Sequence, residues 1–376
     1  MRGEAAREWL QWTKFRLRMA LALRDPVPAE AASAEELDHL VELQLAHWRR
    51  LLPVAGAQAE RLLHDRNQQS VNIFIISIRG KRVKVWDKPA LADDVQRDPA
   101  MRRVLDTARR RILFYKTFIG FVVSRSSASY HLDFALDVSD IVEQHDGLPV
   151  FAFQKMRGDS TVLLPDVDFF HDKWYRQARD LLSYDDKTVS ACFVGASTGG
   201  DLSLEGVQND ELPRLRAAHY FHDSPDVYFK IAKAVQCLGD EARLLLQSKP
   251  YFSARVDWHD QLTRRFIISM DGNGAACSRL VRGLMSNGAV IKYDSPHEVY
   301  YVPALTAGRD YILVRSDSEV AEVVRAERES PGRFRPVAES GQRFARKYLQ
   351  IGSVVGYTDR LLASYASVVE EARRGC

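Results

Sequence analysis

The stretch RRFIISMDGNGAACSRLVRGLMSNGAVIKY, residues 264–293, decides how the second half of this chain folds. An apolar run typical of a buried strand ends in Asp-Gly-Asn-Gly, a segment with helical spacing follows, and a second apolar run closes the stretch. The first turn of a helix carries free backbone N–H groups and the positive end of the helix dipole, which together favour an anion. The stretch therefore predicts a strand, a helix and a strand, with a phosphate site at the helix start.

The side chains near that turn suit a phosphate group. Gly272 and Gly274 open the helix, and Ser278 and Arg279 lie in its first turn or so. An arginine there can form a forked, charge-assisted pair with a diphosphate. The spacing fits neither the dinucleotide fingerprint nor the P-loop. A second interpretation therefore stays open, in which the glycines form a tight turn and the arginine makes a surface ion pair.

A second glycine-rich segment, FVGASTGG at residues 193–200, repeats this pattern. A strand ends in Gly195, and Ser197, Thr198 and the two following glycines offer hydroxyl groups and unhindered backbone. Ligands of open α/β sheets bind at the carboxyl ends of the strands. The segment is either a part of the same anion site or a plain flexible loop.

The segment DVSD, residues 137–140, ends an expected strand in the first half of the chain. A carboxylate at the carboxyl end of a strand is well placed to act as a general base, and Asp137 and Asp140 are the two candidates. Aspartates in such loops also cap helices, and this second interpretation stays open.

The composition is that of a globular protein with two domains. The chain has 376 residues, 46% of them hydrophobic and 27% charged, which is too long for one ordinary core. A net charge of +3 is too small to indicate nucleic-acid binding. The four cysteines, Cys192, Cys237, Cys277 and Cys376, show no metal-type or disulfide spacing, so we expect reduced thiols and a cytoplasmic protein.

The N-terminal segment EWLQWTKFRLRMALALR, residues 8–24, mixes basic residues into apolar positions, unlike the core of a signal peptide. Trp12, Phe15 and Met19 share one helical face. The segment is expected to pack on its own domain or to lie as an amphipathic helix on the inner membrane, which would make the protein peripheral there.

Patterns along the chain predict an α/β protein. The first ~65 residues are expected to be helical, with Ser33 and Glu36 as a capping box. Alternation then predicts strands in the first half at residues 71–86 (two strands around a turn), 131–140 and 148–156, with a helix at 100–120 between the first two groups. The second half alternates strands at 192–195, 266–270, 289–293 and 311–314 with helices at 227–239, 277–285, 316–327 and 353–374, as a parallel sheet requires.

We expect two Rossmann-like domains that face a cleft, an arrangement known as GT-B. The first covers residues 1–185 together with the returning helix at 350–376, and the second covers 186–349. Four His-Asp pairs also occur, at residues 64–65, 171–172, 222–223 and 259–260. Metal-dependent phosphohydrolases gather such pairs on a helical bundle, so chance adjacency is the better interpretation here.

Taken in order, residues 132–362 resemble glycosyltransferase family 90, which includes capsule proteins of the CAP10 type, protein O-glucosyltransferases and lipopolysaccharide glycosyltransferases. ALDVSD resembles the family's strand that ends in a catalytic aspartate, and LPVFAFQK and VLLPD resemble the segments that follow it. CFVGAST stands where the family has the loop F-R-G-S-R-T. The stretch at 264–293 resembles the nucleotide-binding core, and HEVYYVPAL and YILVRSDSEV resemble the segments after that core.

The resemblance implies an inverting, metal-independent transfer of a hexose or pentose from a UDP-sugar, with no cofactor. It assigns Asp140 as the general base and extends the nucleotide-sugar site to Asp271, Glu298 and Tyr300. A D-x-D pair would hold Mn²⁺ in a metal-dependent enzyme, but DVD at 166–168 follows the catalytic strand and is interpreted as loop carboxylates.

Two departures from the family pattern concern the donor side. The arginine of the family loop is Val194 here and its first serine is Ala196, so we expect Lys155, Arg157 or Arg279 to compensate for a missing contact. The family serine of the core motif falls at Cys277 or Ser278.

The resemblance and the basic N-terminus together suggest a glycan or glycolipid acceptor, in the synthesis of lipopolysaccharide core or capsule. Two alternatives remain at this stage. Val194 would also suit a protein that binds a nucleotide sugar or glycan without catalysis, and the His-Asp pairs would suit a metal-dependent hydrolase.

Overall fold

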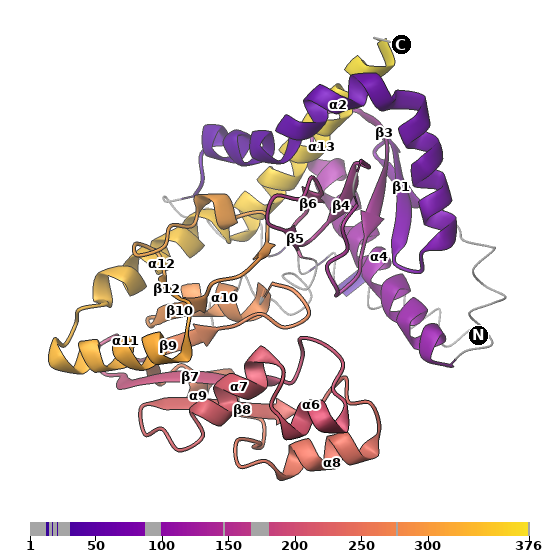
Figure 1. Cartoon of the computed structure of the whole chain (residues 1–376). Helices are drawn as coiled ribbons and strands as arrows, with labels where there is room; N and C mark the ends of the chain where they lie inside the picture. Colours follow the sequence, from indigo (N-terminus) through magenta and orange to yellow (C-terminus); the bar gives the residue numbers. More distant parts are fainter. Residues whose placement is uncertain are drawn as a thin grey trace. The chain divides into compact units, whose positions relative to one another are not determined.

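The computed structural model of the chain describes residues 13–14, 17, 21, 31–86, 99–145, 147–166, 180–275 and 277–374 (Figure 1). The chain forms two compact units. Unit 1 consists of residues 1–173, 298–303 and 350–376, and unit 2 consists of residues 174–297 and 304–349. The expected amphipathic face of Trp12, Phe15 and Met19 lies outside the described residues, as do Val167, Asp168 and the pair at 171–172.

Unit 1 is built on a mixed sheet with the strand order β2-β1-β3-β4-β6. Strands β1 and β2 form an antiparallel hairpin in which Arg79 lies opposite Arg82, as the sequence predicts, and β1 also pairs antiparallel with β3. Strands β3, β4 and β6 are parallel. The strands of this sheet are β1 (Ile73–Gly80), β2 (Arg82–Val85), β3 (Tyr130–Asp137), β4 (Val150–Ala152) and β6 (Val162–Leu163).

Long helices cover the sheet of unit 1. They are α2 (Ala34–Gln69), α4 (Pro99–Arg125) and α13 (Ile351–Arg374), and α13 packs along α2 (Figure 1). The expected capping box at the start of α2 is confirmed, because Ser33 N donates to Glu36 Oε2 at 3.0 Å and Glu36 N donates to Ser33 Oγ at 3.2 Å. The helix expected at 100–120 is also confirmed and extends to Arg125.

Unit 2 contains a parallel sheet with the strand order β12-β10-β9-β7-β8. Its strands are β7 (Thr188–Ala196), β8 (Val227–Lys233), β9 (Arg264–Ser269), β10 (Ala289–Tyr293) and β12 (Ile312–Val314). Its helices are α6 (Leu204–Gln208), α7 (Pro213–Tyr220), α8 (Asp240–Ser248), α9 (Trp258–Gln261), α10 (Cys277–Leu284), α11 (Asp317–Glu329) and α12 (Arg335–Tyr348). The chain is therefore α/β, as expected from the strand–helix alternation. Three short elements remain: β5 (Lys155–Met156), β11 (His297–Glu298) and a 3-10 helix, η1 (Val302–Ala304).

One expected element of unit 2 is wrong. Residues 227–239 are predicted to be a helix, but residues 227–233 form strand β8, which pairs in parallel with β7. The burial of its residues alternates with a period of two, from Val227 to Ile231, as in a strand with one face on the core. Over so short a run the apolar residues fit both the helical period of 3.6 and the strand period of two. Parallel pairing with β7 is what makes the segment a strand.

Strands and helices of unit 2 share one apolar core. Phe193 of β7 stacks on Phe229 of β8 with ring centroids 4.2 Å apart, and Phe266 of β9 meets Phe334 edge to face at 5.7 Å. Helix α11 begins at the capping box that the sequence predicts, since Ser316 Oγ accepts from Glu319 N at 3.3 Å.

A buried ion pair joins α11 to the sheet of unit 2. Glu327 is fully buried and accepts from Arg265 Nη1 at 2.6 Å, Gly332 N at 2.7 Å and Phe334 N at 3.1 Å. Removing one partner of such a pair leaves the other charge buried and unpaired.

We predict that Glu327→Gln lowers the free energy of unfolding by about 3–5 kcal/mol, because Arg265 loses its counter-charge. Urea denaturation followed by circular dichroism measures this. Glu329→Gln, an exposed glutamate on the same helix, is the control and is expected to change little. Equal effects of the two substitutions would contradict the prediction.

Candidate active site

The loops after β7 and β9 meet at the carboxyl edge of the parallel sheet in unit 2. Gly199 N donates to Asn273 Oδ1 at 3.1 Å, so residues 195–200, the end of β7 with the turn after it (the β7 loop), lie against residues 270–275 (the β9 loop). Both loops belong to the glycine-rich segments that the sequence singles out. The structure therefore brings together Gly195, Ser197 and Thr198 with Asp271, Gly272 and Gly274.

Arg214, at the start of α7, ties these two loops together. Its Nη1 donates to Ala196 O at 3.0 Å and to Thr198 Oγ1 at 2.6 Å in the β7 loop. Its Nη2 donates to Met270 O at 2.8 Å and its Nε to Asp271 O at 2.9 Å in the β9 loop. One guanidinium thus fixes the separation of the two loops, because its planar fork allows little freedom.

Gly272 is required where the loops touch. A Cβ atom on this residue would lie 2.2 Å from Thr198 Oγ1 and 3.0 Å from Arg214 Nη2, so both side chains would have to move. Gly199, with φ at +133°, adopts a backbone conformation that other residues rarely reach. The glycines of these segments therefore serve the close approach of the loops.

Arg279 lies in the first turn of α10, beneath the β7 loop. Its Nη1 donates to Gln261 Oε1 at 3.0 Å and its Nη2 donates to the carbonyl oxygen of Val194. The guanidinium lies over two aromatic rings, 4.5 Å from the centroid of Phe193 and 5.0 Å from that of Trp258. Arg214 also lies over the Phe193 ring, at 5.2 Å. The two cations thus share one ring at the carboxyl edge of the sheet.

Neither of these two guanidiniums forms an ion pair with a carboxylate among the residues that the structure describes. Burial, together with the charge of Arg279, lowers the pKa of Arg214 to about 10, and the charge of Asp271 acts in the opposite direction. Burial likewise lowers the pKa of Arg279 to about 10, with Arg282 adding to the effect. Both groups stay protonated at neutral pH. Two partly buried cations with no carboxylate in ion-pair contact among the described residues favour an anion nearby.

Asp271 is held by a polar cluster within unit 2. Its Oδ2 accepts from the hydroxyl of Ser295 and lies 2.7 Å from His297 Nδ1. Ser295 Oγ in turn accepts from His297 N at 2.9 Å. The carboxylate that sequence reasoning assigns to the nucleotide-sugar site is thus bound to the loop after β10.

The two serines assigned to the site differ in their surroundings. Ser197 is fully buried, and its hydroxyl donates to Val235 O and accepts from Val235 N, both at 2.9 Å, so it fixes the β7 loop. Ser278 is partly exposed at the first turn of α10, and its hydroxyl has no partner within the described part of the chain. The hydroxyl of Ser278 is therefore the one that a ligand can reach.

Cys192 of β7 is buried near these arginines. Burial raises the pKa of its thiol to about 11, although the charges of Arg264 and Arg279 act in the opposite direction. The thiol is therefore protonated at neutral pH and does not act as a nucleophile there.

Unit 1 contains the predicted general base. Asp140 lies three residues after the end of β3, and 57% of its side chain is exposed. Arg111 of α4 donates from Nη2 to Asp140 Oδ1 at 3.0 Å. Gln154 Nε2 donates to Asp140 O at 2.9 Å.

Asp137, the second candidate in DVSD, lies in a different environment. Its side chain is buried, accepts from Ser139 N at 2.7 Å through Oδ1, and lies 3.1 Å from His145 Nε2 through Oδ2. His145 is itself 1% exposed. The contact between Asp137 and His145 fixes the start of the loop that carries Asp140. Of the two aspartates, only Asp140 is accessible to solvent.

Glu298 and Tyr300 also belong to unit 1. Glu298 Oε1 lies 3.9 Å from Arg157 Nε, and its charge partly opposes the fall that burial causes in the pKa of Lys155. Tyr300 is buried, and its ring packs against that of Tyr357 on α13 with centroids 4.6 Å apart. Tyr300 is thus a packing residue in this structure, whereas Glu298 lies in a cluster of charges.

Sequence reasoning missed three residues of these clusters. Arg214 has no motif around it, and only its place one residue after Pro213 at a helix start could have drawn notice. Arg111 is the last of three consecutive arginines, and such a run usually forms a solvated face. His297 gives no signal in the sequence, because its partner Asp271 lies 26 residues away.

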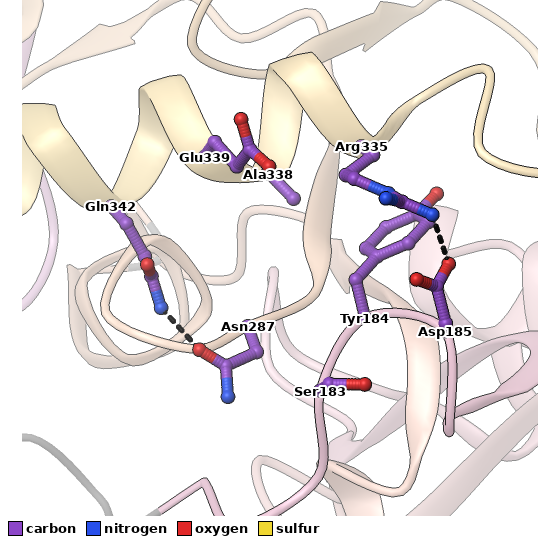
Figure 2. A pocket seen from close by; sticks show the side chains of 8 residues that line it. All are labelled: Ser183, Tyr184, Asp185, Asn287, Arg335, Ala338, Glu339 and Gln342. Atoms are coloured by element: carbon purple, nitrogen blue, oxygen red, sulfur yellow. Dashed lines mark hydrogen bonds and ion pairs between the residues drawn. The ribbon is translucent and has the colours of Figure 1, made fainter.

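A pocket of about 320 Å³ lies at the other edge of the sheet in unit 2 (Figure 2). Its walls come from the segment before β7, the residue Asn287 before β10, and α12. Figure 2 shows the two bonds that tie its walls together, one from Gln342 Nε2 to Asn287 Oδ1 at 2.5 Å and one between Arg335 and Asp185. The pocket is therefore separate from the strand-end loops, where ligands of parallel sheets bind.

Among the described residues, no group that could hold a metal ion combines two of the His-Asp pairs. The side chains of His222 and Asp223 lie 2.8 Å apart and those of His259 and Asp260 3.6 Å apart, and His222 Nδ1 also lies 2.7 Å from His219 O. Asp257, His259 and Asp260 could hold a metal ion, but all three are exposed, and exposed acidic groups often cluster without one.

Comparison with known proteins supports the expected family. The model of glycosyltransferase family 90 matches residues 132–373, well over half of the chain. The chain belongs to glycosyltransferase family 90. Protein O-glucosyltransferase 2 of Danio rerio is 31% identical over 114 residues, which are 30% of this chain and 23% of that protein. The chain thus covers less than a quarter of that relative.

The matched model describes a family of glycosyl transferases. The family match includes Asp140, the strand-end loops and both arginines, Arg214 and Arg279. Among the described helices, none combines the length and apolar character that crossing a bilayer requires.

We predict that Gly272→Ala destabilises unit 2 by ~1–3 kcal/mol, because its Cβ must displace Thr198 and the guanidinium of Arg214. Gly120→Ala is the matched control. A Cβ there meets nothing within 4 Å on helix α4, so this change is expected to stabilise by ~0.5–1 kcal/mol. Urea denaturation of both variants measures the difference, and a neutral Gly272→Ala would contradict the close approach of the loops.

Proposed function

We propose that the protein is an inverting, metal-independent glycosyltransferase that moves a hexose or pentose from a UDP-sugar to a hydroxyl group of a glycan or glycolipid. Unit 2 binds the nucleotide sugar and unit 1 supplies the general base. We further propose that the two domains expected from the sequence, residues 1–185 with 350–376 and residues 186–349, adopt the GT-B arrangement. Lipopolysaccharide core or capsule synthesis at the cytoplasmic face of the inner membrane is the corresponding process.

The pair of partly buried guanidiniums, Arg214 and Arg279, is the observation that carries this proposal. A diphosphate at the strand-end loops supplies the ion-pair contact that no described carboxylate makes with them, since their acceptors are carbonyl, hydroxyl and amide oxygens. The N-terminal turn of α10, with Ser278, offers further donors to the same anion. Because the negative charge on the diphosphate grows as the glycosidic bond breaks, these groups stabilise the transition state more than the bound donor.

Val194 stands where the family loop has an arginine, and two other arginines contact this part of the chain. The family loop carries an arginine at this position, whereas here the carbonyl oxygen of Val194 accepts from Arg279, and Arg214 reaches the same loop from α7. We infer that the two arginines together replace the charge that the loop lacks. Lys155 and Arg157, the other residues considered for this role, lie with Glu298 in unit 1.

Asp140 is the proposed general base. In the reaction the acceptor oxygen bonds to the anomeric carbon, its proton passes to the Asp140 carboxylate, and the bond from that carbon to the diphosphate breaks, which releases UDP. The exposure of Asp140 supports this role, because a general base must come within hydrogen-bond distance of the acceptor hydroxyl. The neighbouring Asp137 is committed to His145 and Ser139.

A second candidate function is a protein that binds a nucleotide sugar or glycan without catalysis. The loop residue Val194 favours it, as does the use of both terminal nitrogens of Arg279 in bonds within unit 2. Turnover of any UDP-sugar that depends on Asp140 separates the two functions.

We predict that Asp140→Asn lowers sugar transfer by ~10²–10⁴-fold, because general-base assistance is lost, while UDP still binds. Transfer of radiolabelled sugar from a panel of UDP-sugars to deacylated glycolipid measures the rate, and calorimetry measures UDP affinity. Asp186→Asn, an exposed aspartate in unit 2, is the control. Unchanged turnover in Asp140→Asn removes this residue from the mechanism.

We also predict that transfer persists after dialysis against EDTA, because arginines and a helix start take the place of a metal ion. Restoration of a lost activity by Mn²⁺ or Mg²⁺ would instead show metal dependence. The assay with the active UDP-sugar, repeated with and without added metal, distinguishes the two results.

A further inference from the structure

Arg111 differs from the other arginines in its stretch of α4. Arg109 and Arg110 are exposed, whereas only 22% of the Arg111 side chain is exposed. The three consecutive arginines look alike in the sequence, but the helix turns the third toward the loop after β3. A solvated basic face therefore does not describe Arg111.

The guanidinium of Arg111 holds this loop at two points. Its Nη1 donates to Val138 O at 2.9 Å, and its Nη2 donates to Asp140 Oδ1 at 3.0 Å. One rigid, planar group thus binds the backbone and a side chain of residues two positions apart. The geometry fixes the direction in which the Asp140 side chain leaves the loop.

Two further contacts fix the same assembly. Gln154 Nε2 donates to Asp140 O at 2.9 Å from the segment after β4, so the backbone of Asp140 is held as well as its carboxylate. Arg111 lies over the ring of Phe153, 5.9 Å from its centroid, which holds the guanidinium in turn. Residues of α4 and of the β4 exit therefore converge on one aspartate.

We propose that Arg111 is a positioning residue, which holds the Asp140 carboxylate in the orientation that accepts the acceptor proton. This inference rests on the proposed function, in which Asp140 is the general base. An aspartate more than half exposed would otherwise sample several rotamers, and only some bring its oxygen within hydrogen-bond distance of the hydroxyl. Arg111 acts on the reaction through Asp140 and touches neither substrate.

The test compares Arg111→Met with Arg111→Lys and with the control Arg110→Met. Methionine keeps the aliphatic bulk near Phe153 and removes both donors. We expect Arg111→Met to lower kcat by ~10²-fold, as misplacement of a reacting group by ~1 Å does. KM for the UDP-sugar should stay within about twofold, because the donor site lies on unit 2. Arg111→Lys, which restores one cation, should recover part of kcat, and Arg110→Met should match the wild type.

Added guanidinium chloride at low concentration distinguishes positioning from a general loss of structure. It should raise kcat of Arg111→Met and leave Arg110→Met unchanged, since a free guanidinium can occupy the space beside Asp140. A fall in kcat that comes with a lower melting temperature, and that neither lysine nor guanidinium restores, would overturn the positioning role. So would a wild-type kcat in Arg111→Met.

Failure of the proposed function gives a different result. If the wild type and Arg110→Met transfer no sugar from any UDP-sugar, or if Asp140→Asn transfers as fast as the wild type, the general-base mechanism falls and the role of Arg111 falls with it. If the wild type transfers sugar in an Asp140-dependent way and Arg111→Met keeps its kcat, the role of Arg111 alone is overturned.

Discussion

The candidate site depends on two guanidiniums that lie over one phenylalanine ring without a carboxylate partner among the described residues. Arg214 donates hydrogen bonds to four acceptors in the β7 and β9 loops, and Arg279 donates to Val194 and Gln261. Neither forms an ion pair with a described carboxylate, and the charge of Asp271 favours the cation only at Arg214. An arrangement that keeps two like charges together at the ends of two strands is costly without an anion, and this is why a diphosphate suits it.

The same use of arginine recurs in unit 1 with the opposite purpose. Arg111 contacts a carboxylate, Asp140, and a carbonyl of the same loop, so its charge is matched and its fork serves orientation. In unit 2 an arginine organises the loops on which an anion is proposed to bind, and in unit 1 an arginine organises the proposed base. In both units the arginine lies on a helix and contacts a loop at the end of a strand, Arg111 on α4 and Arg214 on α7.

Much of the fold could be predicted from the sequence, because the spacing of apolar residues and the capping of helices depend on residues that are close in the chain. The hairpin of β1 and β2, the capping boxes at Ser33 and Ser316, and the strand–helix–strand stretch at 264–293 were all predictable. Strand β8 was not, because its short apolar run fits a helix until β7 pairs with it. Arg214, Arg111 and His297 were missed for a related reason. Their partners are 16 to 57, 27 to 29 and 26 residues away, and no spacing rule reaches so far.

The most direct test of the account is a titration of isotope-labelled protein with UDP and with uridine, followed by backbone amide NMR. The account predicts that UDP shifts the amides of residues 195–200 and 271–279, that uridine shifts them far less, and that the amides around the pocket of Asn287 and Arg335 stay in place. Equal shifts with uridine, or shifts confined to that pocket, would contradict a diphosphate site at the strand-end loops.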